Sequence, residues 1–285
     1  MRALSLAALQ TAPVPRDPEA TLGLLARRVR SLRTTVPHAQ LAVLPELHLS
    51  APPSTLEEHS GYAREVAVEI PGPLTEALGR IAAESEIWLV PGSVYELASD
   101  GRVHNTAVVL APDGELVASY RKVFPWQPHE TCAPGEEFVT FDIPEVGRVG
   151  LAICYDGSFP ETFRQLAWMG AELIVQVNLT TTSDREQELV MARANAIFNQ
   201  LYVLSLNAAT PAGVGRSLIA DPEGLVRVAS GSGEEVLTDV LDLEAVERVR
   251  RFGTAGVSRM WEQMMREGPG IELPMYGGSV REPAP

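Results

Sequence analysis

The sequence predicts an α/β protein in which two mixed β-sheets pack face to face and helices cover their outer sides. Short apolar runs of strand length alternate with segments of helical period along most of the chain. The turn Pro112-Asp113-Gly114 joins two strand-like runs directly, so the sheet around it must contain an antiparallel pair. The strand-like runs also fall into two halves of the chain with helices between them, which favours two sheets rather than one.

Length and composition indicate one layered domain with a large core. The chain has 285 residues, of which 45% are hydrophobic and 21% are charged. A formal charge of -14 disfavours nucleic acid and anionic membranes as partners, and the short cluster Arg27 to Arg33 is expected to be a solvated helix face. Two cysteines cannot form a disulfide framework, and residues 1–10 lack the pattern of a signal peptide. With no apolar run of membrane-spanning length, we expect a soluble, cytoplasmic protein.

The first elements lead to an acidic residue. A strand is predicted over Leu4 to Gln10, and a helix over Asp17 to Leu32, with Asp17 as its cap and Pro18 in its first turn. The next strand, Leu41 to Leu44, runs directly into Pro45 and Glu46. Layered α/β proteins usually place functional side chains at the carboxyl end of such strands. The alternative for Glu46 is a loop carboxylate in water.

The rest of the first half ends at a lysine. Its predicted elements are a loop and weak helix (Ser50 to Ile70), a helix (Leu74 to Ser85) and three strands (Ile87 to Pro91, Val103 to Leu110, Leu116 to Tyr120). A Gly-containing turn at Ser99 to Gly101 is expected to join the first two of these strands. Lys122 closes the last strand, and Val123 to Glu137 reads as a long irregular loop.

The second half begins with a strand that ends at a cysteine. Val149 to Ile153 is small and apolar, and Glu161 to Gly170 has helical period with Pro160 in its first turn. Cys154 therefore lies at a strand-to-helix elbow, which lifts a side chain out of the sheet and directs backbone N–H groups toward it. That geometry suits a nucleophile beside an oxyanion hole, although a free cysteine is often just a small buried hydrophobe.

The remaining predicted elements are a strand (Leu173 to Val177), a polar loop (Asn178 to Asp184), a helix (Glu186 to Asn199), four strands (Tyr202 to Leu206, Gly215 to Ala220, Leu225 to Ala229, Val236 to Leu241) and a helix (Leu243 to Arg251) before a Gly- and Pro-rich tail.

Three of these strand ends carry the groups that cysteine-dependent hydrolysis of an amide or nitrile requires. Such a reaction needs a thiolate, a base that generates it and later activates water, and a cation for the developing oxyanion. Cys154, Glu46 and Lys122 supply these groups in that order. The five histidines have no metal-ligand spacing and none lies in an obvious elbow, so we expect no metal or other cofactor, and a Cys-His arrangement is disfavoured.

These residues resemble the blocks of the nitrilase superfamily of carbon-nitrogen hydrolases. Leu44-Pro45-Glu46, Tyr120-Arg121-Lys122 and Gly150-Leu151-Ala152-Ile153-Cys154-Tyr155-Asp156 occur in that family's order. The resemblance covers roughly residues 1–250 as a carbon-nitrogen hydrolase domain and leaves 251–285 as an extension that packs on its own or a neighbouring subunit. It implies a four-layer α-β-β-α sandwich and a homodimer or higher homo-oligomer.

The resemblance also implies roles for individual residues. Glu46 corresponds to the general base, Lys122 to the oxyanion-stabilising cation and Cys154 to the nucleophile. The segment 121–130 is similar to the lysine block of the aliphatic amidase and formamidase branch, whose second glutamate corresponds to Glu130, a fourth catalytic residue that orients substrate and lysine.

Further positions bear on the substrate. Tyr155 and Trp126 are expected to bind substrate with the loop 179–184, whereas Phe198 and Trp168 are as easily core residues. Phe198 departs from many relatives, which carry Glu there, and Cys132 has no family role.

The block after the nucleophile favours an amide substrate. Tyr155-Asp156 is similar to amidases, whereas true nitrilases usually carry Trp-Glu there. The sequence therefore predicts a hydrolase of small linear amides. A nitrilase, an N-carbamoyl amide hydrolase, an acyltransferase and a non-catalytic binding module remain alternatives, and the acyl chain, the pathway and the number of subunits stay open.

Overall fold

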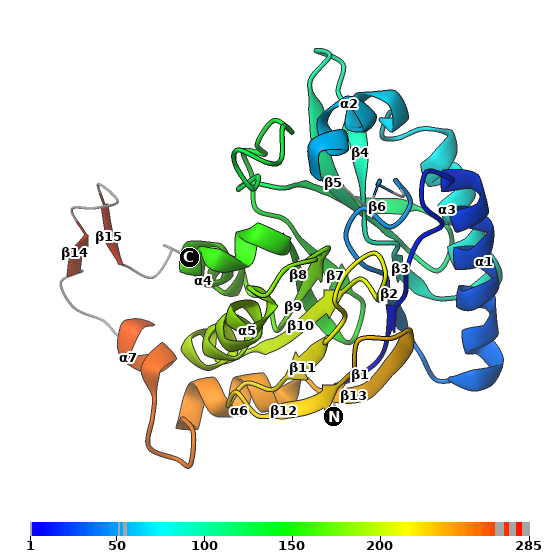
Figure 1. Cartoon of the computed structure of the whole chain (residues 1–285). Helices are drawn as coiled ribbons and strands as arrows, with labels where there is room; N and C mark the ends of the chain where they lie inside the picture. The colour runs from blue at the N-terminus through cyan, green and yellow to red at the C-terminus, as the bar shows by residue number, and fades with distance from the viewer. Residues whose placement is uncertain (1, 51, 54–55, 266–270, 274–277, 281–285) are drawn as a thin grey trace.

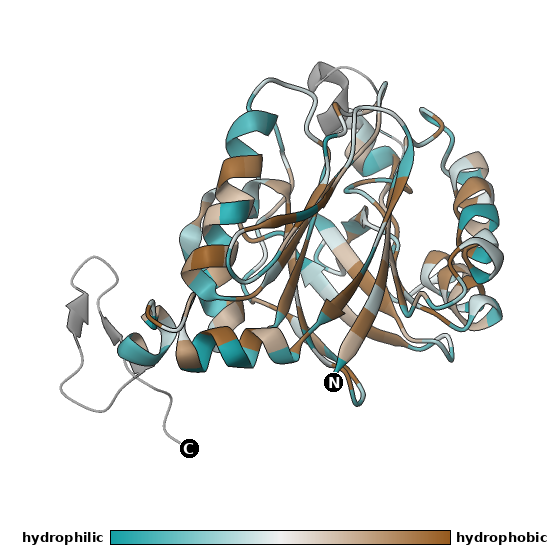
Figure 2. Cartoon of the chain, turned by 90° about the horizontal axis from the view of Figure 1, so that it is seen from below, coloured by the Kyte–Doolittle hydropathy of each residue, from teal (hydrophilic) through white to brown (hydrophobic). Residues whose placement is uncertain are grey.

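The computed structural model describes residues 2–50, 52–53, 56–265, 271–273 and 278–280. Two β-sheets lie face to face in the centre, and helices cover the outer side of each sheet (Figure 1). Figure 2 shows the same layers from below, with helices on both sides of the strands and hydrophobic residues, in brown, along the central strands. The predicted fold class, a four-layer α/β sandwich with two mixed sheets, is confirmed.

The first sheet has the order β13-β1-β2-β3-β5-β4, with β6 paired to β5. Its strands are β1 (Ala3–Gln10), β2 (Leu41–Val43), β3 (Trp88–Val90), β4 (Ser93–Leu97), β5 (Val103–Leu110), β6 (Leu116–Arg121) and β13 (Glu235–Asp242). β1, β2 and β3 are parallel, β5 is antiparallel to β3, and β6 is antiparallel to β5. Because β5 runs opposite to β3 and β6 runs opposite to β5, β6 has the same direction as β2. β2 and β6 therefore end at the same edge of the sheet.

The second sheet has the order β12-β11-β10-β9-β8-β7. Its strands are β7 (Thr140–Ile143), β8 (Gly147–Ile153), β9 (Leu173–Asn178), β10 (Tyr202–Asn207), β11 (Leu218–Ala220) and β12 (Val226–Ala229). The central strands β8, β9 and β10 are parallel and almost fully buried, as the continuous apolar runs predicted.

Helices α1 (Pro18–Thr35) and α3 (Pro73–Ser85) cover the first sheet, and α4 (Pro160–Trp168) and α5 (Arg185–Asn199) cover the second. One apolar cluster joins α1 and α3 to their sheet, and a larger one fills the space between the sheets and under α4 and α5. The side chain of Asp17 caps α1, as expected, by accepting a hydrogen bond of 2.9 Å from Ala20 N. The other helices are α2 (Leu56–Val66), α6 (Glu244–Phe252) and α7 (Met260–Met265).

Several elements differ from the prediction. β4 and β7 were not predicted, and the turn at Ser99 to Gly101 connects β4, not β3, to β5. The strand expected from Gly215 begins only at Leu218, because Gly215 and Arg216 have φ angles of 63°. β13 comes from the second half of the chain but belongs to the first sheet, where it pairs with β1 along eight residues and forms an edge strand.

The C-terminal extension contacts its own subunit at Trp261. The backbone N–H of Trp261 donates to Gln200 Oε1 at 3.1 Å, and the Arg250 guanidinium lies 4.5 Å from the centre of the Trp261 ring. Part of the expected extension, including residues 266–270, 274–277 and 281–285, lies outside the described residues. Among the helices that the structure describes, none is both long enough and apolar enough to cross a bilayer.

Candidate active site

Three strand ends bring Glu46, Lys122 and Cys154 to one cavity. Glu46 follows β2, Lys122 follows β6, and Cys154 follows β8 of the facing sheet. The loop after β2 can take this path only beside a glycine: a Cβ on Gly92, where φ is +87°, would lie 1.7 Å from the carbonyl oxygen of Pro45. The structure thus places the three residues that the sequence singled out on one cavity.

Cys154 lies on a strained elbow. It has a φ of 47° and opens a short 3₁₀ turn, Cys154–Ser158, that leads into α4. Gln176 Nε2 donates to the Cys154 carbonyl at 2.8 Å. A Cβ on Gly157 would lie 2.1 Å from that same nitrogen, so the glycine leaves room for the amide that anchors the turn.

Asp156 ties this elbow to the segment that follows Lys122. Its carboxylate accepts hydrogen bonds from Ile153 N (2.9 Å), Phe124 N (2.9 Å) and the Tyr120 hydroxyl (2.8 Å). Burial raises the pKa of Asp156 to about 6, with Lys122 and these donors opposing the rise. The contacts give Asp156 a structural part in the elbow.

Lys122 is held between two carboxylates. Its side chain is 2% exposed, and Nζ donates to Glu46 Oε1 at 3.1 Å and to Glu130 Oε2 at 2.6 Å. Each carboxylate also accepts a hydrogen bond from a backbone N–H group. Leu179 N donates to Glu46 Oε2 at 2.8 Å, and Trp126 N donates to Glu130 Oε2 at 3.0 Å. The structure therefore brings all four sequence-predicted catalytic residues together.

Asn105 is a central contact that the sequence analysis missed. Its Nδ2 donates to Glu46 Oε1 and to Glu130 Oε1, both at 2.9 Å, from the fully buried middle of β5. Nothing in the sequence singled it out, because Asn105 lies between two other polar residues of the predicted strand, His104 and Thr106.

Burial and charge set the protonation of the cluster. Burial raises the pKa of Glu46, although Lys122 opposes it. Burial also acts to raise the pKa of Glu130, but the Lys122 ammonium and the donors from Trp126 and Asn105 outweigh it and lower that pKa. Burial acts to lower the pKa of Lys122, but the two carboxylates overcome it and hold it well above its usual value. Lys122 is therefore cationic, and Glu46 is the carboxylate poised to take a proton.

The Cys154 thiol is neutral at rest. Burial raises its pKa well above the usual value, and the nearby Glu46 carboxylate adds to the rise. The sulfur thus requires a base when it attacks, and Glu46 is the carboxylate at hand.

The cavity in front of Cys154 has a volume of about 120 Å³. Both residues expected to bind substrate, Tyr155 and Trp126, line it, as does part of the loop after β9. Cys132 also lines the cavity, and burial raises its pKa to about 12. Phe198, considered as a core or pocket residue, is instead 53% exposed on α5.

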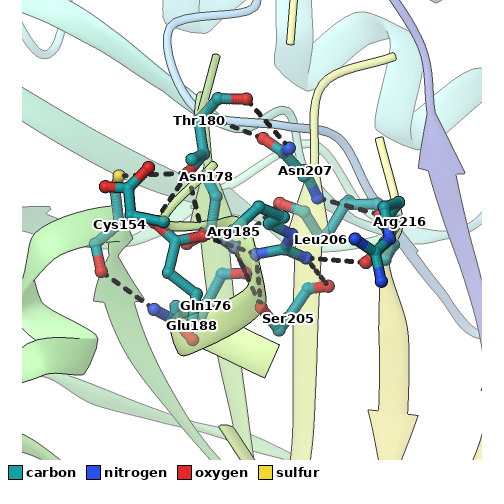
Figure 3. Close-up of polar contacts among 12 residues, drawn as sticks. Cys154, Gln176, Asn178, Thr180, Arg185, Glu188, Ser205, Leu206, Asn207 and Arg216 are labelled. Carbon is teal, nitrogen blue, oxygen red and sulfur yellow. Dashed lines mark hydrogen bonds and ion pairs between the residues drawn. The ribbon is translucent and has the colours of Figure 1, made fainter. Parts of the chain in front are cut away.

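A second polar network begins beside the sulfur (Figure 3). The Thr180 hydroxyl is 4.0 Å from Cys154 Sγ and donates to the Glu188 carboxylate at 2.7 Å. Arg185, which is 1% exposed, donates to Glu188 Oε2 at 2.8 Å, to Ser205 and to the Arg216 carbonyl. The sequence analysis named the loop that carries Thr180 but not these partners, because the helix pattern of α5 did not reveal which of its polar residues face inward.

The comparison with family models matches residues 5–251 to the carbon-nitrogen hydrolase family. Omega-amidase NIT2 of Mus musculus is 34% identical over 208 residues, which cover 67% of this chain and 74% of that protein. The chain belongs to the carbon-nitrogen hydrolase family. It is accordingly an enzyme of the group that hydrolyses carbon-nitrogen bonds, as the sequence predicted.

Other relatives agree with this assignment. A formamidase of Bacillus cereus is 31% identical over 215 residues, which cover 73% of this chain and 64% of that enzyme. Among solved structures, Nit3 of Saccharomyces cerevisiae, a member of branch 10 of the nitrilase superfamily, superposes with a TM-score of 0.79 at 28% identity and covers 88% of this chain and 94% of its own. An amidase from Nesterenkonia sp. AN1 shares the fold, with a TM-score of 0.75 at 24% identity over 87% of this chain and 97% of its own.

Proposed function

We propose that this protein is a cysteine-dependent amidase that hydrolyses small linear carboxylic amides to the carboxylate and ammonia through a thioester. The observation that carries the proposal is the convergence of Cys154 with a buried Glu46-Lys122-Glu130 cluster on one cavity. The similarity to an omega-amidase and to a formamidase supports an amide substrate. A cavity of about 120 Å³ suits an acyl group of a few carbons.

In the first half of the reaction, Glu46 accepts the thiol proton of Cys154 while the sulfur attacks the amide carbon. The developing oxyanion is stabilised by Lys122 and the backbone N–H of Tyr155. An ammonium has three N–H donors, and Glu46 and Glu130 take two of those of Lys122, which leaves one for the substrate oxygen. Glu46 then passes its proton to the amide nitrogen, the C–N bond breaks, and ammonia departs.

In the second half, water replaces ammonia. Glu46 takes a proton from the water as its oxygen attacks the thioester, Lys122 again stabilises the oxyanion, and the proton returns to the departing sulfur. Glu130 acts by holding Lys122 and Asn105 in place, because one of its oxygens accepts from each of them. We also propose, from the family resemblance, that the domain spans residues 1–250 and that subunits associate as homo-oligomers.

The test is ammonia release from propionamide by the purified protein. We expect turnover in the unchanged protein and in Cys132→Ala, which removes the other cysteine that lines the cavity, and no turnover in Cys154→Ala. Hydrolysis of a nitrile or an N-carbamoyl amino acid in place of propionamide would contradict the proposed substrate class, and turnover by Cys154→Ala would contradict the nucleophile.

A further inference from the structure

Glu188 is a carboxylate fixed inside the cavity beside the nucleophile. Its side chain is 12% exposed and lines the cavity together with Cys154. Both carboxylate oxygens accept from the Thr180 hydroxyl, at 2.7 and 2.9 Å, and Oε2 also accepts from Arg185 (Figure 3). A carboxylate has about four acceptor positions, so these two donors leave capacity for a further donor from the cavity.

The separation between Glu188 and the sulfur matches a short acyl chain. Thr180 Oγ1 lies 4.0 Å from Cys154 Sγ and 2.7 Å from Glu188 Oε1. These two distances together set the upper limit of the separation between the sulfur and the Glu188 carboxylate. With C–C bonds of about 1.5 Å, an acyl chain of two methylenes bound at the sulfur brings its terminal group within hydrogen-bonding reach of that carboxylate.

The cavity lining carries an excess of negative charge. Four acids line it (Glu46, Glu130, Asp184 and Glu188), and among the described residues Lys122 is the only lysine or arginine that does so. Lys122 is already bound to two of the acids. Arg185 neutralises Glu188 in part, but its other donors point to Ser205 and to the Arg216 carbonyl, away from the cavity lining. An anionic acyl chain would meet like charge here, whereas a cation would be attracted.

Aromatic side chains strengthen the preference for a cation. Tyr95, Trp126 and Tyr155 all line the cavity. The face of an aromatic ring attracts an ammonium group, most strongly where water is excluded. The acids and the aromatic rings that line this small cavity thus both favour the binding of a short chain that ends in an ammonium group.

We propose that the cavity selects short amides whose acyl chain carries an ammonium group, with Glu188 accepting hydrogen bonds from that group, and that it rejects acyl chains that end in a carboxylate. The proposal rests on the amidase function proposed above and names its substrate class.

Three amides of equal length test this selection. 3-Aminopropanamide, butanamide and succinamate each carry two methylenes next to the amide and end in an ammonium, a methyl and a carboxylate. We expect kcat/KM to fall in that order, with at least a tenfold difference between the first and the last. Succinamate hydrolysed as well as 3-aminopropanamide would overturn the proposal while leaving the amidase function intact.

Binding separates this proposal from the failure of the amidase function. Calorimetry of the same three compounds with Cys154→Ala, which cannot turn over, is expected to give the tightest binding for 3-aminopropanamide. If none of the amides is hydrolysed by the unchanged protein, the amidase function fails, and the order of affinities still decides whether the cavity selects a cation.

Substitutions of Glu188 and Asp184 test whether these acids cause the selectivity. In Glu188→Gln we expect the ratio of kcat/KM for 3-aminopropanamide to that for butanamide to fall at least fivefold. Asp184→Asn, at another acid of the cavity lining, should lower the same ratio and serves if Glu188→Gln does not fold. Glu223→Gln, an exposed acid in the turn before β12, is the matched control and should leave the ratio unchanged. An unchanged ratio in both cavity variants would overturn the proposal.

Discussion

Two buried cations flank Cys154, and their partners differ. Lys122 and Arg185 are 2% and 1% exposed, and each donates to glutamate, but Lys122 donates only to the carboxylates of Glu46 and Glu130 and lines the cavity. Arg185 also binds Ser205 and a backbone carbonyl behind the cavity. Burying a charge is costly unless its partners satisfy it. Both partners of Lys122 line the cavity, whereas Glu188 is the one partner of Arg185 that does so, and the others, Ser205 and the Arg216 carbonyl, belong to neighbouring segments of the fold. We infer that Lys122 serves the chemistry and Arg185 serves the structure.

The largest expected effect is that of Lys122→Met, which removes the charge and keeps the length. We expect kcat/KM for propionamide to fall about 100-fold to 1,000-fold, as for the loss of an oxyanion donor. The loss of stability should be limited, because one of the two buried carboxylates, Glu46 or Glu130, can take up a proton once the cation is gone. Steady-state ammonia assays and thermal unfolding measure the two quantities.

The matched change Arg185→Met should lower stability strongly and activity only weakly. It leaves Glu188 without its cation and removes donors from Ser205 and the Arg216 carbonyl, so we expect a loss of about 3 kcal/mol in the free energy of unfolding. Activity per folded molecule should fall less than tenfold. If Arg185→Met remained as stable as the unchanged protein and lost as much activity as Lys122→Met, the comparison would fail.

A smaller effect is expected for Glu130→Gln, which keeps the side-chain shape but removes the charge that holds Lys122 at 2.6 Å. Because a charge-assisted hydrogen bond becomes a neutral one, kcat/KM should fall about tenfold. A loss as large as that of Lys122→Met would show that Glu130 takes part in the chemistry directly, not through Lys122.

The pH profile sharpens the role of Glu46. Glu46 must be ionised to accept the thiol proton, and its pKa is raised by burial and, to a smaller extent, by the charge of Glu130. Activity should therefore fall as the pH decreases through that raised pKa, at a pH above the ordinary range of a glutamate. In Glu130→Gln this acid limb should move to lower pH. An acid limb that stays in place would mean that another group controls it.

Asn105→Ala should have the smallest effect of the series. It removes two hydrogen bonds to charged acceptors but leaves both ion pairs of Lys122 in place. We expect a loss of about 2 kcal/mol in stability and a fewfold decrease in kcat. Denaturant unfolding and the ammonia assay report these separately, and unchanged stability would remove Asn105 from the account.

The sequence predicted the ends of strands better than the contacts between them. Apolar runs located β2 and β8, a hairpin turn located β6, and the residues that follow those strands share one cavity. Strand β4 escaped because Ser93–Leu97 carries polar residues on a buried edge, where Glu96 is satisfied by Arg121. Such partners lie far apart in the chain, so no local pattern signals them.

The same limit applied within the site. Asn105, Arg185 and Glu188 each act through hydrogen bonds to residues in other elements, and nothing in their own segments distinguishes them from solvated polar residues. Phe198 shows the converse, since its apolar character suggested burial although it lies exposed on α5.

The most direct test of the central claim is to trap the acyl-enzyme. Protein mixed with propionamide is quenched in acid during turnover, digested and weighed by mass spectrometry. We predict a propionyl group on the peptide that contains Cys154 and none on the peptide that contains Cys132, which lines the same cavity and serves as the internal control. Ammonia release with no acyl group on Cys154, or with the acyl group on Cys132, would contradict the account.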